Sequence, residues 1–295
     1  MDWKSKRVRA ILETALAEDK AAHDVTTEMT VEHGLRASAA IVAMEPCVVS
    51  GMGCIPVFLE LFSTMNARPV GRFEVISHPE MFDGVRVRKG QTIAVIRHNA
   101  GALLSCERVI LNLMQRMSGI ATLTHEFVQA VEGTKVRVRD TRETIPGLRA
   151  LDKYAVCCGG GVNHRLDLQD GILIQSNHIL LGGGLPAVLE RVKKARRAGQ
   201  VVQVEVRNEK ELEQAIAGGA EAIRLDNMTP AAVKKSVKQV RQELPGVPVE
   251  ASGNIGLKDV RKYALAGVDY VSVSALTHSA VAADLSMRIT ADASR

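Results

Sequence analysis

The stretch that decides the fold is Val201–Asn227, which reads VVQVEVRNEKELEQAIAGGAEAIRLDN. It begins with Val201–Val206, which is rich in β-branched side chains and predicts a strand. Glu209–Ala217 has the apolar spacing of an amphipathic helix, and Ala222–Leu225 is a second short apolar strand. A strand, a helix and another strand in such close succession predict two parallel strands joined by a right-handed helical crossover.

The same alternation continues on both sides of this stretch, from Ser118 onward. Further strands are predicted at Val136–Val138, Gly171–Ile174, Val247–Ala251 and Tyr270–Val273. Further helices are predicted at Leu185–Ala198, Pro230–Glu243 and Leu257–Ala266. About six or seven such units would curl into a complete or incomplete βα barrel.

The N-terminal part has a different pattern, in which short alternating strands lie between helices. Helices are predicted at Val8–Leu16, Pro56–Phe62 and Ala102–Met117, and strands at Ala37–Met44, Cys47–Val49, Phe73–Ser77, Arg86–Val87 and Thr92–Arg97. We therefore expect an N-terminal domain over residues 1–117, joined by the C-terminal segment 279–295, and a barrel domain over residues 118–278.

The composition fits a globular α/β protein and argues against nucleic-acid binding. Hydrophobic residues make up 46% of the 295 residues and aromatic residues only 3%, as expected for packed helices and parallel strands. The net charge of +5 comes from Lys and Arg spread along helices, without the aromatic partners of a base-stacking surface. We expect no nucleic acid partner.

The cysteines and the N-terminus bear on the compartment. The five cysteines form neither a CxxC pair nor a His-spaced metal pattern, and an odd number fits a reducing compartment. The N-terminus lacks the apolar core of a signal peptide, and no apolar run has the length of a membrane helix. We therefore expect a cytoplasmic protein that does not insert into membranes.

Polar residues follow four of the predicted strands. Glu205 closes VVQVEV, Asp226 follows AIRL, Ser252-Gly253-Asn254 follows VPVEA, and Ser274-Ala275 follows DYVSV. Ligands of parallel α/β folds bind at the carboxyl ends of the strands. Ordinary loop starts are the alternative, because Asp, Ser and Gly also favour helix caps. Four such strand ends favour the rim of an active site.

Cationic residues gather in Asp140–His178, DTRETIPGLRALDKYAVCCGGGVNHRLDLQDGILIQSNH, which contains Arg142, His164 and Arg165. Arg108 of the long helix is expected to join them. Arginine matches carboxylate and phosphate oxygens in pairs, so these residues suit an anionic acceptor. Structural ion pairs remain the alternative for Arg149 and Arg165, as does a loop-fixing hydrogen bond for His178.

The acidic pair and the SGN turn suggest a second ligand. Glu205 and Asp226 suit sugar hydroxyls, a magnesium ion or a developing positive charge. The turn offers backbone N–H groups to a phosphate. Together with the cations, these residues predict an acidic acceptor and a phosphorylated sugar as substrates.

The residues also carry a family resemblance. The chain resembles the quinolinate phosphoribosyltransferase family, the carboxylating nicotinate-nucleotide pyrophosphorylases of NAD synthesis. The matching segments span nearly the whole chain and are LAEDKAAHDVTT at Leu16–Thr27, VVSGMG at Val48–Gly53, ERVILNLMQRMSGIAT at Glu107–Thr122, DTR and PGLR within 140–149, GGGVNHR at 159–165, LDN at 225–227 and SGN at 252–254. The resemblance implies an α/β protein with an N-terminal α/β sandwich and a C-terminal open α/β barrel. It also implies a homodimer, or a larger assembly, whose active site takes an arginine from the partner subunit.

The resemblance further implies residue roles. Arg108 would be the arginine given to the partner's site, and quinolinate would bind with Arg142, His164 and Arg165, with Thr141, Glu143 and Gln175 in the same pocket. Glu205 and Asp226 would face the ribose and the Mg²⁺ of phosphoribosyl pyrophosphate, as catalytic residues. The 5′-phosphate would lie on Ser252, Gly253, Asn254, Val273, Ser274 and Ala275. The implied products are nicotinate mononucleotide, pyrophosphate and CO2.

Three positions of this pocket depart from the family pattern. The family usually has lysine where this chain has Glu143 and Gln175, and glycine where it has Ser274. The two lysine replacements remove about three units of positive charge, and one charge pair about 4 Å apart is worth about 4 kcal/mol at an effective dielectric constant near 20. Three interpretations stay open: a quinolinate phosphoribosyltransferase, a paralogous phosphoribosyltransferase with a less anionic acceptor, and a non-catalytic binding or regulatory paralogue.

Overall fold

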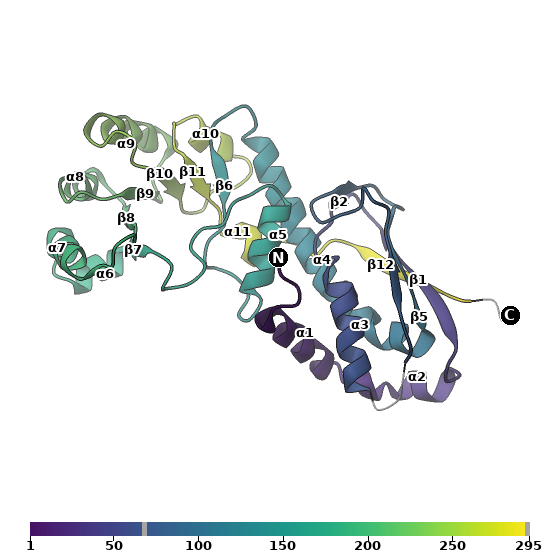
Figure 1. Cartoon of the computed structure of the whole chain (residues 1–295). Helices are drawn as coiled ribbons and strands as arrows, with labels where there is room; N and C mark the ends of the chain where they lie inside the picture. Colours follow the sequence, from purple (N-terminus) through teal and green to yellow (C-terminus); the bar gives the residue numbers. More distant parts are fainter. Residues whose placement is uncertain (67–69, 293–295) are drawn as a thin grey trace. The chain divides into compact units, whose positions relative to one another are not determined.

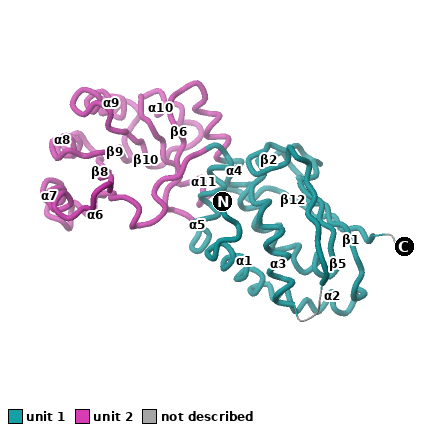
Figure 2. The backbone as a smooth tube through the Cα atoms, in the orientation of Figure 1, with its two compact units in different colours: residues 1–123, 145–160, 280–295 teal, residues 124–144, 161–279 magenta. Residues whose placement is uncertain are grey.

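The computed structural model of the chain describes residues 1–66 and 70–292, which form two compact units (Figures 1 and 2). Unit 1 consists of Met1–Leu123, Ile145–Gly160 and Ala280–Arg295, and unit 2 of Thr124–Thr144 and Gly161–Ser279. The predicted domain boundaries at 117 and 278 fall a few residues before these limits. Residues 145–160 belong to unit 1 although they lie between two segments of unit 2 in the sequence. The sequence pattern did not predict this, because the strand–helix alternation continues on both sides of the segment.

Unit 1 combines short strands with long helices. Its elements are α1 (Lys6–Glu18), η1 (Ala21–His23), α2 (Val25–Thr30), β1 (Arg36–Ala43), β2 (Cys47–Val48), α3 (Cys54–Met65), β3 (Glu74–Ile76), β4 (Arg86–Val87), β5 (Thr92–Asn99), α4 (Ala100–Ala130), which runs on into unit 2, α5 (Arg149–Cys158) and β12 (Leu285–Ala291).

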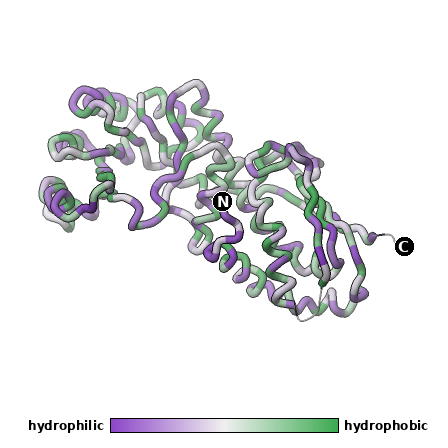
Figure 3. The backbone as a smooth tube through the Cα atoms, in the orientation of Figure 1, coloured by the Kyte–Doolittle hydropathy of each residue, from purple (hydrophilic) through white to green (hydrophobic). Residues whose placement is uncertain are grey.

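An antiparallel sheet of order β12-β1-β5-β3 forms one layer of unit 1. The C-terminal strand β12 pairs along β1, from Ala37 opposite Ala291 to Ala43 opposite Leu285, and so joins the end of the chain to this unit. Helices α1, α3 and the first part of α4 lie on one side of the sheet (Figure 1). Helix α3 and β1 carry long hydrophobic stretches (Figure 3), and Phe58 and Ile41 are fully buried. This arrangement is the predicted α/β sandwich.

Unit 2 alternates strands and helices. Its elements are β6 (Arg137–Arg139), β7 (Ile172–Ile174), α6 (Ser176–Leu181), α7 (Leu185–Ala195), β8 (Val202–Val206), α8 (Glu209–Ala217), β9 (Ala222–Asp226), α9 (Pro230–Glu243), β10 (Val249–Ser252), α10 (Val260–Ala264), β11 (Tyr270–Ser272) and α11 (Ala275–His278).

The six strands of unit 2 form one parallel sheet of order β6-β11-β10-β9-β8-β7. β6 and β7 stand at the two ends of this order, and the outer side of β6 makes a parallel bridge to Val162. Within the described residues no strand pairing joins these two ends, so the barrel is open, as the resemblance implied. Helices α7, α8, α9 and α10 lie on the outer side of the strands (Figure 1). The predicted helices at Glu209–Ala217 and Pro230–Glu243 are confirmed residue for residue.

The strands of this sheet have one apolar and one polar face. Val202, Val204 and Val206 of β8 are buried toward the helices, as are Ile223 and Leu225 of β9. The alternate residues carry amide, carboxylate, guanidinium and hydroxyl groups that bond to one another across neighbouring strands. Successive side chains of a strand point to opposite faces, so this alternation directs all the polar groups inward. A barrel interior more often holds branched apolar side chains.

Several short elements have no counterpart in the sequence prediction. Helices α2, α5, α6 and α11 lie in segments for which no helix was predicted, and α4 continues to Ala130 where Met117 was the expected end. Short helices give weak periodicity, and tertiary packing decides whether they form. Among the described residues, no helix combines the length and the apolarity needed to cross a membrane.

Candidate functional site

The carboxyl ends of β8 and β9 bring Glu205 and Asp226 to one place, as expected from parallel neighbours. The guanidinium of Arg207 joins them, with Nη2 3.6 Å from Glu205 Oε1 and Nε 3.4 Å from Asp226 Oδ2. Both acids are largely buried, whereas the side chain of Arg207 is 51% exposed. The two buried carboxylates therefore share one half-exposed arginine as their counter-ion.

Ser252 at the end of β10 extends this arrangement. Its Oγ donates to Asp226 Oδ1 at 2.8 Å and accepts from Arg224 Nε at 2.7 Å. Asn227, directly after β9, donates from Nδ2 to Asp226 Oδ2 at 2.8 Å and from its backbone N–H to the Ser252 carbonyl at 2.9 Å. These contacts fix the Asp226 carboxylate on both oxygens.

The turn after Ser252 approaches the Asn227 backbone closely. Gly253 has φ +92°, and a Cβ at this position would lie 2.3 Å from Asn227 Oδ1 and 2.8 Å from its backbone nitrogen. Only glycine combines a positive φ with the absence of a Cβ, and this turn requires both. Asn254 and Asn227 also adopt positive φ values, 47° and 53°.

Gln175 follows β7 and is the N-cap residue of α6. Its side-chain amide donates to Glu205 Oε2 at 3.2 Å, so the predicted pocket position does lie beside the acidic pair. Its backbone N–H donates to His178 Nδ1 at 3.0 Å, which completes a capping box of α6. His178 thus fixes the loop, one of the two roles left open. We call Gln175, Glu205, Arg207, Asp226 and Ser252 the rim cluster.

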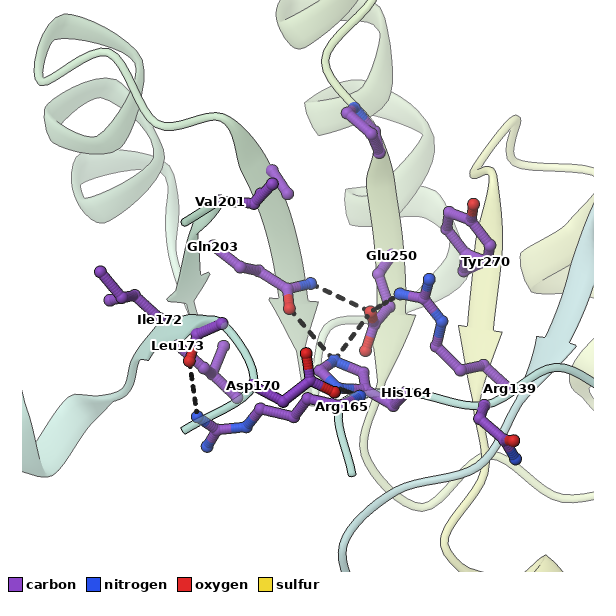
Figure 4. A pocket seen from close by; sticks show the side chains of 14 residues that line it. Arg139, His164, Arg165, Asp170, Ile172, Leu173, Val201, Gln203, Glu250 and Tyr270 are labelled. Carbon is purple, nitrogen blue, oxygen red and sulfur yellow. Dashed lines mark hydrogen bonds and ion pairs between the residues drawn. The ribbon is translucent and has the colours of Figure 1, made fainter. Parts of the chain in front are cut away.

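A second set of polar residues, one layer deeper, surrounds Glu250. Its Oε2 accepts from Arg139 Nη1 and from Gln203 Nε2, each at 3.0 Å (Figure 4). Its Oε1 accepts from Ser272 Oγ at 2.7 Å. His164 Nε2 lies 3.1 Å from Gln203 Oε1 and 3.5 Å from Glu250 Oε2. We call Arg139, His164, Gln203, Glu250 and Ser272 the inner network.

The inner network holds a buried negative charge. Burial acts to raise the pKa of Glu250, but the hydrogen bond and charge of His164, the charge of Arg224 and the hydrogen bond of Ser272 outweigh it and hold the pKa well below the usual range. The backbone N–H of Arg165 donates to His164 Nδ1 at 2.7 Å, and this hydrogen bond holds Nε2 of the ring toward Gln203 and Glu250. Glu250 therefore stays ionised at neutral pH.

A cavity of about 310 Å³ lies beside the inner network (Figure 4). It is lined by residues that begin or precede strands, Ile172, Val201, Ala222, Pro248 and Tyr270, together with the loop that carries Asn163, His164, Arg165 and Asp170. Most of this lining lies toward the amino ends of the strands, whereas His164 and Arg165 come from the loop that follows Val162, the bridge partner of Arg139. Ligands of this architecture bind at the carboxyl ends, so we place the site at the rim cluster despite the size of this cavity.

The other predicted site residues of unit 2 fall into two groups. Thr141 is buried after β6, and its Oγ1 accepts the backbone N–H of Glu143. The Glu143 side chain is 64% exposed and lies 3.8 Å from His278, whose Nε2 is 3.1 Å from Ser274 Oγ. The loop of Val273, Ser274 and Ala275 therefore meets Glu143 through His278, at the carboxyl end of β11.

Arg142, Arg165 and Arg224 form the cationic group. Burial lowers the pKa of the Arg165 guanidinium, and the charges of Arg142 and Arg224 lower it further, while Asp170 and Asp167 act in the opposite direction. Arg165 also donates from Nη1 to the Gly171 carbonyl at 3.5 Å. The predicted Arg108 belongs to unit 1, where its side chain is 63% exposed beside Glu107.

Sequence reasoning missed the side chains that connect these groups. Arg224, Gln203 and Glu250 each stand two residues before a predicted site residue, at Asp226, Glu205 and Ser252. A spacing of two places both side chains on the same face of a strand, and this signal was present in the sequence. Arg207 and His278 gave no such signal, because they lie outside the strands.

The acidic residues alone do not make a metal site. Among the described residues, no cluster of three or more His, Cys, Asp or Glu side chains could hold a metal ion. Glu205 and Asp226 already have the guanidinium of Arg207 as a counter-ion. A cation that reaches this pair would need further ligands from a bound anion such as a pyrophosphate.

Known families and structures match the chain over nearly its whole length. The N-terminal and C-terminal domains described as quinolinate phosphoribosyl transferase match residues 24–118 and 120–288. The chain is 39% identical over 290 residues to nicotinate-nucleotide pyrophosphorylase (carboxylating) of Mycobacterium leprae, covering 97% of this chain and 98% of that protein. It is 39% identical over 287 residues to the probable enzyme of that name from Bacillus subtilis, covering 96% and 94%. The crystal structure of NadC from Streptococcus pyogenes superposes with a TM-score of 0.88 at 33% identity, covering 99% of both chains.

Proposed function

The chain belongs to the quinolinate phosphoribosyltransferase family, and from this we propose that it transfers a phosphoribosyl group from phosphoribosyl pyrophosphate to quinolinate. Decarboxylation then gives nicotinate mononucleotide, pyrophosphate and CO2, a reaction of NAD biosynthesis. The observation that carries the proposal is the rim cluster, in which Glu205, Asp226 and Ser252 converge at the carboxyl ends of three neighbouring strands. The enzyme is a pentosyltransferase.

The rim cluster suits the sugar substrate. The pyridine nitrogen attacks the anomeric carbon as the bond to pyrophosphate breaks, and positive charge develops on the ribose. Glu205 and Asp226 provide fixed carboxylates for the ribose hydroxyls and for this charge. The turns at Ser252–Asn254 and Val273–Ala275 offer backbone N–H groups for the 5′-phosphate. The half-exposed guanidinium of Arg207, next to Asp226, can form an ion pair with the pyrophosphate as it leaves.

The cationic group suits the acceptor. Arg142 and Arg165, with Thr141 and His164, are the residues we assign to quinolinate, whose two carboxylates need paired donors. After the N-glycosidic bond forms, the adjacent carboxylate leaves as CO2 and its electron pair passes to the ring, where the positive nitrogen stabilises it. The ring carbon then takes up a proton. The protein contributes mainly position and charge neutralisation.

The proposal also covers the metal ion, the assembly and the location of the protein. We propose that Mg²⁺ enters as the complex of phosphoribosyl pyrophosphate, because the pyrophosphate supplies the ligands that Glu205 and Asp226 lack. We also propose a homodimer in which Arg108 reaches the site of the partner subunit, since among the described residues this exposed arginine has only its neighbour Glu107 as a counter-ion. A cytoplasmic location stays a prediction from the cysteines.

The test is pyrophosphate release from phosphoribosyl pyrophosphate with quinolinate, compared with nicotinate and other pyridine acids. We expect pyrophosphate release and CO2 formation with quinolinate and with none of the other acids. Release with a monocarboxylate but not with quinolinate would point to the less anionic acceptor, and a dimeric protein with no turnover on any acceptor would reject catalysis. Glu205→Gln is the matched inactive variant, and Glu209→Gln on the outer helix is its control.

A further inference from the structure

Arg224 lies among acidic side chains on the polar face of the barrel, in the middle of β9. Its Nε is 2.7 Å from Ser252 Oγ, 3.5 Å from Glu250 Oε1 and 3.9 Å from Glu205 Oε2. The side chain is only 13% exposed. It therefore stands between the inner network and the rim cluster, and partners on both neighbouring strands fix its position.

Only one edge of this guanidinium is occupied. Within the described part of the chain, Arg224 donates a single hydrogen bond, through Nε, so its terminal amino groups retain their donors. Arginine binds a carboxylate most strongly through two parallel N–H donors. The free edge of Arg224 has this geometry.

Two other arginines direct charge to the same region. Burial lowers the pKa of Arg165, and the charges of Arg142 and Arg224 lower it further, so the three guanidinium groups lie within electrostatic range of one another. Like charges held together in this way are stabilised by an anion that binds among them. Three guanidinium groups exceed the need of one carboxylate and match an acceptor with two.

We propose that Arg224 is a third arginine of the acceptor site and that, with Arg142 and Arg165, it binds a pyridine that carries two adjacent carboxylates. This inference rests on the proposed function and names a residue that determines its specificity. Gln175 offers Glu205 only a neutral amide, at 3.2 Å, while Arg224 brings a full positive charge to the same carboxylate. Arg224 thus supplies part of the charge that Glu143 and Gln175 do not.

A merely structural arginine would behave differently. If Arg224 only balanced Glu250 and Glu205, its loss would weaken the binding of every acceptor to the same extent by loosening the sheet. A residue that contacts one of two carboxylates instead affects the dicarboxylate selectively. The ratio of affinities for the two kinds of acid therefore separates the two roles.

The experiment is calorimetric binding of pyridine-2,3-dicarboxylate and pyridine-3-carboxylate to the full chain. We compare the wild type with Arg224→Met and with Arg196→Met, a control whose arginine pairs with Glu221 near the amino ends of the strands. For Arg224→Met we expect dicarboxylate affinity to fall about 10- to 100-fold, as for the loss of one charge-assisted partner, and monocarboxylate affinity to change less than about 3-fold. The control should change neither. Equal losses for both acids, or no loss, would overturn the assignment.

A second variant covers the case in which Arg224→Met does not fold, as judged by circular dichroism. Arg224→Lys keeps the charge beside Glu205 and Glu250 but loses the paired donors, so dicarboxylate affinity should fall about 3- to 10-fold with no change in the melting temperature. Wild-type affinity in this variant would overturn the proposal. Turnover of the wild type is measured in parallel. If the wild type is active and Arg224→Met loses affinity for both acids equally, only the role of Arg224 is rejected. If the wild type binds no dicarboxylate, the proposed function is rejected as well.

Discussion

The inner network and the rim cluster use the same kinds of side chain but in different ways. Around Glu250 the hydrogen bonds are 2.7 to 3.0 Å long and the carboxylate is 1% exposed. Around Glu205 and Asp226 the arginine contacts are 3.4 and 3.6 Å long, and Arg207 is half exposed. Short buried bonds hold strands in register, whereas longer contacts to a half-exposed cation can be exchanged for a ligand. The comparison assigns stability to the hydrogen bonds around Glu250 and chemistry to the carboxylates of Glu205 and Asp226.

The largest expected effect lies in the inner network. Glu250→Ala leaves Arg139 and Arg224 buried without their carboxylate and should lower the free energy of unfolding by about 3–5 kcal/mol, measured by urea denaturation. The control is Glu209→Ala, which removes an exposed pair with Lys235 and should cost less than about 1 kcal/mol. A small effect of Glu250→Ala would break the comparison.

Activity should respond mainly to the rim cluster. Glu205→Gln keeps the shape of the side chain but removes a charge that faces the ribose, so we expect kcat/KM to fall about 100- to 1,000-fold. The free energy of unfolding should change by less than about 1 kcal/mol, because the arginine partners of Glu205 are distant. A stability loss as large as that of Glu250→Ala would show that both layers are structural.

The pH dependence of stability should also distinguish the layers. The pKa of Glu250 is lower in the folded than in the unfolded state, so its contribution is complete above the unfolded value, about 4.3, and is lost as the pH falls toward the folded value. Glu250→Gln should therefore be less stable than the wild type by about 2 kcal/mol at pH 7, with a smaller difference below pH about 4. Urea denaturation across this range measures the difference, and a constant gap would contradict the cause we assign.

The turn that follows Ser252 should tolerate no side chain at Gly253. Gly253→Ala adds a Cβ against Asn227 at a positive φ and should cost about 2 kcal/mol in thermal or urea unfolding. Gly256→Ala is the matched control, since a Cβ there meets no atom within 4 Å. If both variants unfold alike, the close approach of the Gly253 turn to Asn227 is not tight in solution.

The smallest effect should come from restoring the two lysines. Glu143→Lys with Gln175→Lys adds positive charge beside His278 and Glu205, and we expect quinolinate affinity to rise about 10-fold, less than the bare charges imply because both positions are solvated. The same titration of Glu190→Lys, on the outer helix α7, controls for net charge. Unchanged affinity in the double variant would mean that these positions do not face the acceptor.

Much of the fold was determined by the sequence alone. The alternation of Val202, Gln203, Val204, Glu205 and Val206 specifies a strand with one face buried under helices. Repeated strand–helix pairs specify the parallel sheet and place Glu205, Asp226 and Ser252 at its carboxyl edge. These features follow from local periodicity and chain direction, which a sequence records directly.

Only the tertiary structure decided which charges meet. Arg207 reaches Asp226 on the next strand, Gln175 reaches Glu205 across 30 positions, and β12 pairs with β1 although nearly the whole chain separates them. Loop paths and the order of strands set such contacts, and residue spacing does not encode them. For the same reason, the sequence did not predict the contacts of Arg224. Its place on β9 shows that it points inward, but its partners Ser252, Glu250 and Glu205 follow only from which strands lie beside it.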